Sequence, residues 1–211
     1  MKLLLLSFAR WRVRGKQNVP REGPLIVVAN HLSLADPPLL SASMPRHIVF
    51  MAKEELFGWH PLSPLVRGFG AIRIRKNMAD RRALTQARQV LSRGLALGMF
   101  PEGSRSRDHR LQLAYPGAAL LALNTSATIL PVAITGTEKI KGLAWLLRPR
   151  IEVNIGQPFT LDSDTAQNRK LQILQGTETI MRHIAELLPT EYRGKYGGEV
   201  TQLAQEVDSA N

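Results

Sequence analysis

The chain has 211 residues, a length that suits one sizeable α/β-type domain with a full hydrophobic core. It contains no cysteine, which excludes disulfides, thiol nucleophiles and cysteine metal sites, and its five histidines show no paired metal-ligand spacing, so we expect no bound metal. With 28 Lys and Arg against 17 Asp and Glu, the formal net charge is +11, so a partner should be anionic. Nucleic acid, an anionic membrane surface and a phosphorylated substrate all fit that charge, but no nucleic-acid motif accompanies the basic residues.

The first ten residues are mostly apolar, with a lysine at position 2 and an arginine at position 10. This run is too short to span a bilayer, which takes about 20 apolar residues. It also lacks the small-residue cleavage site of a signal peptide. We expect a helix over residues 1–10 that either packs on the domain or lies in a membrane interface. In the second case Arg10, Arg12 and Arg14 would face lipid phosphates.

Short apolar runs alternate with helical patterns along most of the chain, which predicts an α/β fold. Because helices separate neighbouring strands, we expect a single-domain αβα sandwich with a mixed, largely parallel sheet of about six or seven strands. The expected strands are 11–15, 24–30, 48–52, 70–76, 95–100, 128–134 and 151–156, the last of them at an edge of the sheet. The expected helices are 37–43, one between a cap at residue 77 or 80 and a stop at residue 94, 116–123 and 168–188.

A histidine and an aspartate follow the second expected strand. The apolar run ends in Asn30-His31, and Asp36 comes five residues later, just before Pro37. Because α/β proteins keep their chemistry at the carboxyl ends of strands, His31 is a candidate general base and Asp36 the carboxylate that orients it. A turn must bring the two together. A structural interpretation fits as well, in which Asp36 caps the next helix and His31 merely ends a strand.

The expected strand at 95–100 leads into a loop that combines glycine, hydroxyl and guanidinium groups. Pro101 cannot donate to a ladder, Gly103 permits close backbone approach, and Ser104 and Arg105 offer donors to an anion. This loop is typical of a phosphate-binding site. An ordinary turn with exposed arginines explains the same residues equally well.

The last expected helix carries apolar residues that we place on one face, where they would close the core. These are Leu171, Leu174, Ile180, Met181, Ile184, Leu187 and Leu188. Residues 191–211 are polar and contain glycine, so we expect a poorly ordered tail. The predicted organisation is therefore a helix at 1–10, a domain at 11–190 and a tail at 191–211.

Four blocks in chain order resemble the four sequence blocks of the 1-acylglycerol-3-phosphate acyltransferase family, part of the glycerophospholipid acyltransferase superfamily. They are Asn30-His31 with Asp36, residues 70–76, residues 100–106 and residues 130–134. The resemblance implies an acyltransferase domain that moves a fatty acyl group from acyl-CoA or acyl-acyl carrier protein to the free hydroxyl of a lysophospholipid. The implied acceptor is 1-acylglycerol-3-phosphate, which would give phosphatidic acid, and no cofactor is implied beyond the acyl donor.

The resemblance also implies roles for individual residues. His31 would be the general base and Asp36 its orienting partner. The acceptor phosphate would lie against residues of the second and third blocks, namely Arg75, Lys76, Glu102, Gly103, Ser104 and Arg105. The other motif positions are Asn30, Gly70, Pro101 and Pro131, the last on the acyl-donor or membrane side. The implied partners are the lipid acceptor, the thioester donor, acyl carrier protein and an anionic membrane surface. We expect the protein to be cytoplasmic and peripheral to the inner face of the cell membrane. We expect no nucleic-acid partner.

Some positions depart from the family pattern. Ser104 stands where threonine is common, Arg75 where an acid is frequent, and Tyr115 where many relatives carry lysine. The missing lysine keeps other acceptors open, such as a lyso-aminolipid, a glycolipid or another lysolipid. A basic, non-catalytic membrane-binding module is the alternative from a different functional class.

Overall fold

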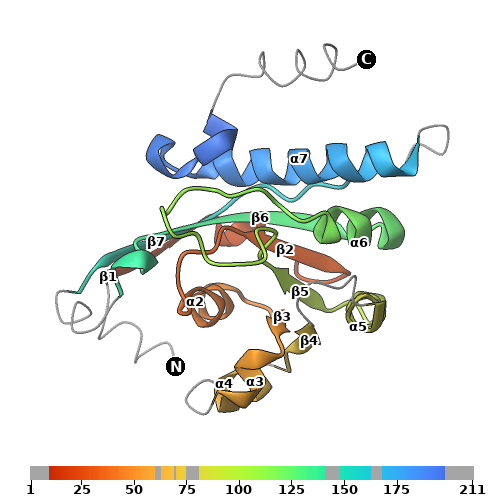
Figure 1. Ribbon diagram of the computed structural model, residues 1–211, viewed down its shortest axis with the longest axis horizontal. Helices are drawn as coiled ribbons and strands as arrows, with labels where there is room; N and C mark the ends of the chain where they lie inside the picture. Colours follow the sequence, from red (N-terminus) through yellow and green to blue (C-terminus); the bar gives the residue numbers. More distant parts are fainter. Residues whose placement is uncertain are drawn as a thin grey trace.

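The computed structural model describes residues 10–59, 63–68, 70–74, 81–140, 148–162 and 168–197. In this part of the chain, seven strands form one sheet with helices against both faces (Figure 1). The strands are β1 (Arg10–Arg14), β2 (Leu25–Ala29), β3 (Ile48–Lys53), β4 (Ile72–Ile74), β5 (Ala96–Met99), β6 (Thr128–Thr135) and β7 (Arg150–Ile155). The α-helices are α2 (Asp36–Ser43), α3 (Glu55–Gly58), α4 (Ser63–Gly68), α5 (Arg81–Ser92), α6 (Gly117–Thr125) and α7 (Arg169–Leu187). The 3-10 helices are η1 (Lys16–Asn18), η2 (Thr137–Lys139), η4 (Thr190–Tyr192) and η5 (Gly194–Gly197).

The strand order is β1-β7-β6-β2-β5-β3-β4, which places β2 at the centre of the sheet. The strands from β6 to β4 in that order are parallel to one another. β7 pairs antiparallel with β6, and β1 pairs parallel with β7. The expected αβα sandwich with a mixed, largely parallel sheet is therefore confirmed.

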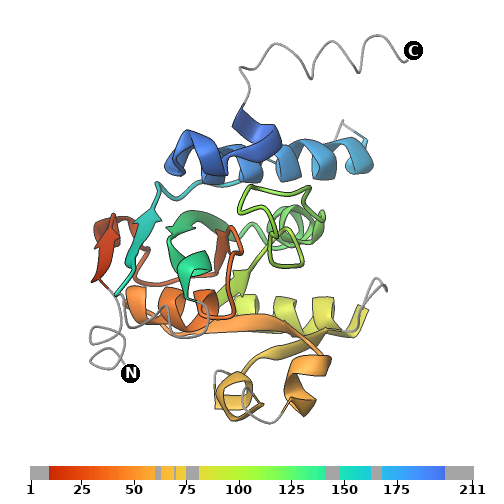
Figure 2. The ribbon, with the colours of Figure 1, turned by 60° about the vertical axis from the view of Figure 1, so that its left-hand side comes forward.

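The central strand β2 is buried on both faces, which explains its continuous apolar sequence. Ile26 and Val28 point to the side covered by α5, α6 and α7. Val27 and Ala29 point to the other side, where α2 packs. Figure 1 and Figure 2 both show α7 and α2 on opposite faces of the sheet. This double burial holds the end of β2, and the polar residues that follow it, in a fixed place.

Helices α6 and α7 pack closely through a small residue. A Cβ added at Gly176 of α7 would lie 3.3 Å from the Cβ of Ala119 in α6 and 2.7 Å from Cδ1 of Leu161. Glycine at this position therefore lets the two helices approach.

None of the helices in the described ranges combines the length and the apolarity needed to cross a membrane.

Two sequence-based expectations about packing are wrong. The strand expected at an edge, β7, lies between β1 and β6, and the edges are β1 and β4. On α7, Leu171 and Leu174 are 48% and 55% exposed. The buried stripe of this helix instead begins at Gln172 and continues every fourth residue through Gly176, Ile180 and Ile184. Met181 and Ala185 are buried as well. At 100° per residue, Leu171 falls outside the buried face, whereas Leu174 lies in line with Met181 and Ala185, which are buried further along the helix.

The beginning of the expected tail is folded. Residues 190–192 and 194–197 form η4 and η5, so the expectation of poor order is wrong for residues 191–197, while residues 1–9 and 198–211 lie outside the described residues. The hydroxyl of Tyr192 donates to Oε1 of Glu138 over 2.9 Å. The backbone N–H of Leu111 donates to the carbonyl of Tyr192 over 2.8 Å. This segment therefore contacts the loop after β5, which comprises residues 100–116.

Candidate active site

The end of β2 is held to the neighbouring strand β6 by one buried side chain. The Asn30 amide donates from Nδ2 to the carbonyl of Ile134 over 2.8 Å, and its Oδ1 accepts the N–H of Ile134 over 2.7 Å. Asn30 is only 3% exposed. It thus continues the pairing of β2 and β6 one step further, directly before His31.

We expect Asn30→Ala to destabilise the fold by about 2–4 kcal/mol, because it leaves a buried N–H and a buried C=O of Ile134 without partners. Chemical denaturation monitored by circular dichroism measures this loss. Asn168→Ala is the control, since Asn168 caps α7 in an exposed position through one bond to the Lys170 N–H. It should cost only about 1 kcal/mol. Equal losses in the two variants would contradict the role given to Asn30.

His31 and Asp36 meet across the turn between β2 and α2. Nδ1 of His31 lies 2.8 Å from Oδ2 of Asp36. The same oxygen accepts the backbone N–H groups of Leu32 and Ser33 over 2.6 and 2.7 Å. Asp36 is the first residue of α2 and is fully buried. The structure therefore brings the predicted pair together, and the carboxylate binds the turn that carries His31 instead of capping α2.

This arrangement determines which nitrogen of His31 is available for chemistry. A carboxylate facing Nδ1 places the ring proton there, so Nε2 carries the free lone pair. The His31 side chain is 15% exposed, and its ring stacks on Phe100 with 4.2 Å between ring centroids. Such a histidine can accept a proton from a hydroxyl that reaches Nε2, while the buried carboxylate stabilises the resulting imidazolium.

The loop after β5 holds the backbone of the same histidine. Oε1 of Glu102 accepts the His31 N–H over 2.8 Å, and Oε2 accepts the Gln112 N–H over 2.9 Å. The Ser106 N–H donates to the carbonyl of His31 over 2.8 Å. Burial raises the pKa of the Glu102 carboxyl to about 7; the two backbone N–H bonds oppose this rise, and the charges of Asp36 and Asp108 add to it.

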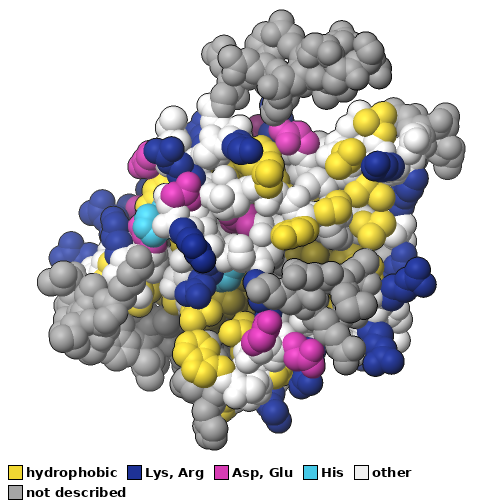
Figure 3. Space-filling model, viewed as in Figure 1, with side chains coloured by type: hydrophobic (Ala, Val, Ile, Leu, Met, Phe, Trp, Pro, Cys, Tyr) yellow, Lys and Arg dark blue, Asp and Glu magenta, His cyan; other side chains and the backbone are white. Residues whose placement is uncertain are grey.

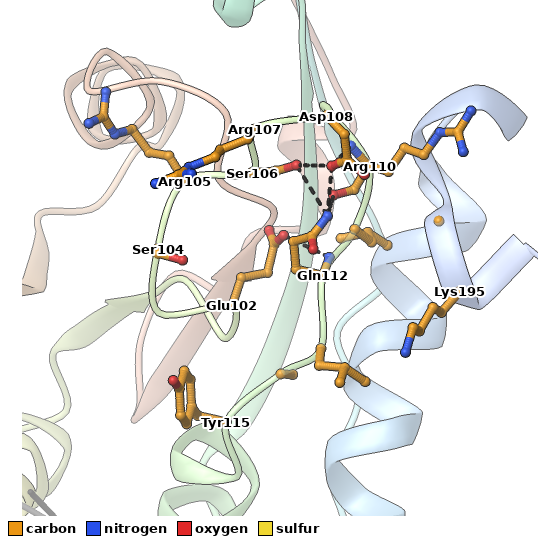
Figure 4. A pocket seen from close by; sticks show the side chains of 14 residues that line it. Glu102, Ser104, Arg105, Ser106, Arg107, Asp108, Arg110, Gln112, Tyr115 and Lys195 are labelled. Carbon is orange, nitrogen blue, oxygen red and sulfur yellow. Dashed lines mark hydrogen bonds between the residues drawn. The ribbon is translucent and has the colours of Figure 1, made fainter. Parts of the chain in front are cut away.

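A pocket of about 1040 Å³ lies along this loop. Figure 4 shows side chains from the loop and from η5 around it. Four cations line it, contributed by Arg105, Arg107, Arg110 and Lys195. Ser104 and Arg105 are exposed, as expected for groups that meet a ligand. His31 is not among the residues that line this pocket.

The loop keeps its shape through a glycine and an exposed tyrosine. Gly103 has φ +65°, and a Cβ added there would lie 2.8 Å from Cε2 of Tyr115. The Tyr115 N–H donates to the carbonyl of Pro101 over 2.8 Å. The Tyr115 side chain is nevertheless 69% exposed, and it lines the pocket.

Other predicted positions lie elsewhere. Gly70 has a φ of 62° and precedes β4, at the edge of the sheet and away from β2. Pro131 lies within β6, and its carbonyl accepts the Gly156 N–H over 2.9 Å. Arg75 and Lys76 lie outside the described residues. The part of the chain that the structure describes contains no cluster of three or more potential metal ligands.

Sequence reasoning missed several residues of this region. Gln112 contributes its backbone N–H to Glu102, and Arg110 and Lys195 contribute cations to the pocket. A backbone donor leaves no signature in the residue type. Lys195 comes from the segment expected to be a poorly ordered tail. Only the excess of basic residues in the composition pointed toward the additional cations.

A model of the family described as Acyltransferase matches residues 10–135, from β1 to the end of β6. The chain belongs to the acyltransferase family. The match contains His31, Asp36 and the loop after β5, so the family assignment drawn from the four sequence blocks is confirmed.

Two curated relatives of this acyltransferase-family chain illustrate the range of named activities. Over 162 residues it is 33% identical to a 1-acyl-sn-glycerol-3-phosphate acyltransferase of Streptococcus pneumoniae, covering 75% of this chain and 57% of the relative. Over 126 residues it is 33% identical to a lyso-ornithine lipid O-acyltransferase of Pseudomonas aeruginosa, covering 59% of this chain and 48% of the relative. The chain spans about half the length of the curated relatives it matches.

A solved structure supports the same fold assignment. The crystal structure of the 1-acyl-sn-glycerophosphate acyltransferase PlsC from Thermotoga maritima aligns with a TM-score of 0.68 and 28% sequence identity. The alignment covers 88% of this chain and 76% of that chain. The layered α/β domain described above is therefore the fold of that enzyme.

Proposed function

We propose that this chain transfers a fatty acyl group from a thioester, acyl-CoA or acyl-acyl carrier protein, to the free hydroxyl of 1-acylglycerol-3-phosphate. The product would be phosphatidic acid. The observation that carries the proposal is the His31–Asp36 pair, with 2.8 Å between Nδ1 and Oδ2 and with Nε2 left free to act as a base. The names of the relatives supply the substrate class.

The mechanism we propose is a direct transfer without an acyl-enzyme. Nε2 of His31 takes the proton of the acceptor hydroxyl while that oxygen attacks the thioester carbonyl carbon. The carbon–sulfur bond then breaks, and the leaving thiolate recovers a proton from His31. The Asp36 carboxylate stabilises the imidazolium during the transfer. A positioned base of this kind contributes about 10²–10⁴-fold to the rate.

The acceptor phosphate would lie against the exposed part of the loop after β5. Arg105 can form a bidentate pair with phosphate, and Ser104 adds a hydroxyl next to it. The Glu102 carboxylate does not compete with the phosphate, since both of its oxygens are bound to backbone N–H groups. Held in this way, the acceptor would present its hydroxyl to the base, which contributes through orientation.

A lipid acceptor also places the reaction at a membrane surface. The net charge of +11 favours an anionic surface, and Figure 3 shows Lys and Arg side chains scattered over the face seen in Figure 1. We therefore propose peripheral association with the inner, cytoplasmic face of the cell membrane. Transfer activity that is equal on neutral and anionic vesicles would contradict this part of the proposal.

The direct test is an assay with purified protein and defined substrates. Labelled acyl-CoA and acyl-acyl carrier protein are each incubated with a panel of lysolipids, and the products are identified by mass spectrometry. We expect phosphatidic acid from 1-acylglycerol-3-phosphate. Binding to anionic vesicles without transfer to any acceptor would support the non-catalytic module instead.

A second acceptor class has a specific observation in its favour. Tyr115 lines the pocket at a position where the family resemblance implies lysine, and one relative is named a lyso-ornithine lipid O-acyltransferase. A lyso-aminolipid acceptor would need less positive charge at that position. The same panel separates the two, since the preferred acceptor is the one with the higher kcat/KM.

We expect Arg105→Ala to raise the apparent KM for 1-acylglycerol-3-phosphate by about 10–100-fold, because a charge-assisted hydrogen bond to phosphate contributes about 1.5–3 kcal/mol. The kcat should change much less. Steady-state kinetics with varied acceptor measures both. Arg93→Ala is the matched control, because this substitution removes the same charge at a different place. Arg93 is exposed and lies just after α5, at the amino end of β5. An unchanged KM in Arg105→Ala would exclude Arg105 from the phosphate site.

A further inference from the structure

We propose that Glu102 is a positioning residue. Its carboxylate binds the backbone of His31 to the loop after β5 and so sets the position of the base relative to Arg105 in that loop. This inference rests on the proposed function, because it assigns Glu102 a part in that reaction. It differs from the contact with the acceptor phosphate that the family resemblance implies for this residue.

The carboxylate joins two segments that are far apart in sequence. One oxygen accepts the N–H of His31, 71 positions away, and the other accepts the N–H of Gln112, 10 positions away. Glu102 is 3% exposed. Figure 4 shows its side chain turned toward Gln112, inside the loop. Each carboxylate oxygen thus fixes one end of a bridge from the base to the far end of the loop.

The bridge is completed by a backbone bond in the opposite direction. The Ser106 N–H donates to the carbonyl of His31 over 2.8 Å, so the segment 102–106 holds both main-chain polar groups of His31. Arg105 lies within this same segment. A shift of the segment would therefore move the phosphate-binding side chain and the base together.

The chemistry of Glu102 does not suit direct contact with the acceptor. A carboxylate repels phosphate, and its two oxygens already have donors. In the described part of the chain those donors are backbone N–H groups, and no lysine or arginine pairs with it. Burying a carboxylate without a cation is costly, which the raised pKa reflects. A bridge that orders the base explains why an acid occupies this position.

The test compares Glu102→Gln with a matched buried control. A glutamine side chain offers one acceptor oxygen and an NH₂ group that cannot accept, so it keeps only one of the two backbone bonds. We expect kcat to fall by about 10–100-fold, the effect of a base misplaced by about 1 Å, while the acceptor KM stays within about threefold. Amide exchange of His31 or Gln112, followed by NMR, should accelerate in the same variant.

Glu138→Gln is the control, because Glu138 is also a buried acid, 7% exposed, with its bond to Tyr192. It should leave kcat and the exchange of the His31 amide at wild-type values. Glu102→Asp retains the charge but is one methylene shorter, and we expect it to lose kcat as well because it cannot reach both amides.

Two outcomes would overturn the proposal. A wild-type kcat in Glu102→Gln would show that the bridge has no part in the reaction, and a raised KM with unchanged kcat would assign Glu102 to the acceptor site. If both variants fail to fold, the test uses isotope-labelled wild-type protein. We expect scalar coupling between the His31 backbone nitrogen and the Glu102 carboxyl carbon, transmitted across the hydrogen bond. Absence of this coupling would refute the bridge. If the wild type transfers acyl groups to no lysolipid, the proposed function fails, and the coupling still decides whether the bridge exists.

Discussion

Replacing His31 by alanine should lower kcat for acyl transfer by about 10²–10⁴-fold, the range expected when a positioned general base is removed. The variant should bind the acceptor normally, because Arg105 and the rest of the phosphate-binding loop stay in place. It should also remain folded, since the backbone bonds of residue 31 to Glu102 and Ser106 do not involve the imidazole. Single-turnover assays with labelled acyl donor, together with equilibrium binding of the acceptor, separate chemistry from binding.

His47→Ala is the control for this prediction, because His47 is exposed just before β3, at the amino end of the parallel strands. It should have wild-type kinetics. His31→Gln keeps a side chain of similar size against Phe100, and we expect it to be as inactive as His31→Ala. A His31→Ala protein that turns over at close to the wild-type rate would refute the proposed mechanism.

The arrangement of the sheet follows from the sequence to a large extent. Continuous apolar runs such as Leu25–Ala29 are typical of strands buried on both faces, and the helices between them require parallel pairing. The position of β7 could not be predicted in the same way. Its partner β1 lies about 140 residues earlier, with Arg10 opposite Arg150, and a pairing over that distance has no local signal.

The packing of α7 shows why hydrophobic patterning alone misplaced two leucines. The buried residues of this helix include Gln172 and Gly176, a polar and a small residue, and α6 approaches closely at Gly176. Counting apolar residues assigns Leu171 and Leu174 to the core instead. The face that a helix buries is set by the shape of its neighbour, which the sequence of the helix itself does not contain.

The part of the candidate site that depends on a contact between two side chains could be predicted from the sequence. His31 and Asp36 are a recognisable pair once a turn is assumed, and the structure supplies that turn. Glu102 was recognisable as part of a sequence block, but its partners are backbone N–H groups of His31 and Gln112. Since every residue except proline has such a group, the role of Glu102 becomes visible only in three dimensions.

Asp36→Asn should be the second variant with a large effect, because one carboxylate oxygen accepts three donors. An asparagine oxygen can still accept from the Leu32 and Ser33 N–H groups, so the turn should form. The neutral amide cannot stabilise the imidazolium that forms on His31 during proton transfer. We expect kcat to fall by at least about 10²-fold, the lower end of what loss of the base itself would cost.

The same variant should lose stability, since hydrogen bonds to a charged acceptor contribute about 1.5–3 kcal/mol and become weaker when the acceptor is neutral. Denaturation curves at pH 7 measure this loss, and kinetics are compared at a temperature where both proteins are fully folded. Asp162→Asn is the control, because Asp162 is an exposed acid outside the site. If Asp36→Asn lost stability but kept the wild-type kcat, Asp36 would only hold the turn, and the base would act without a carboxylate partner.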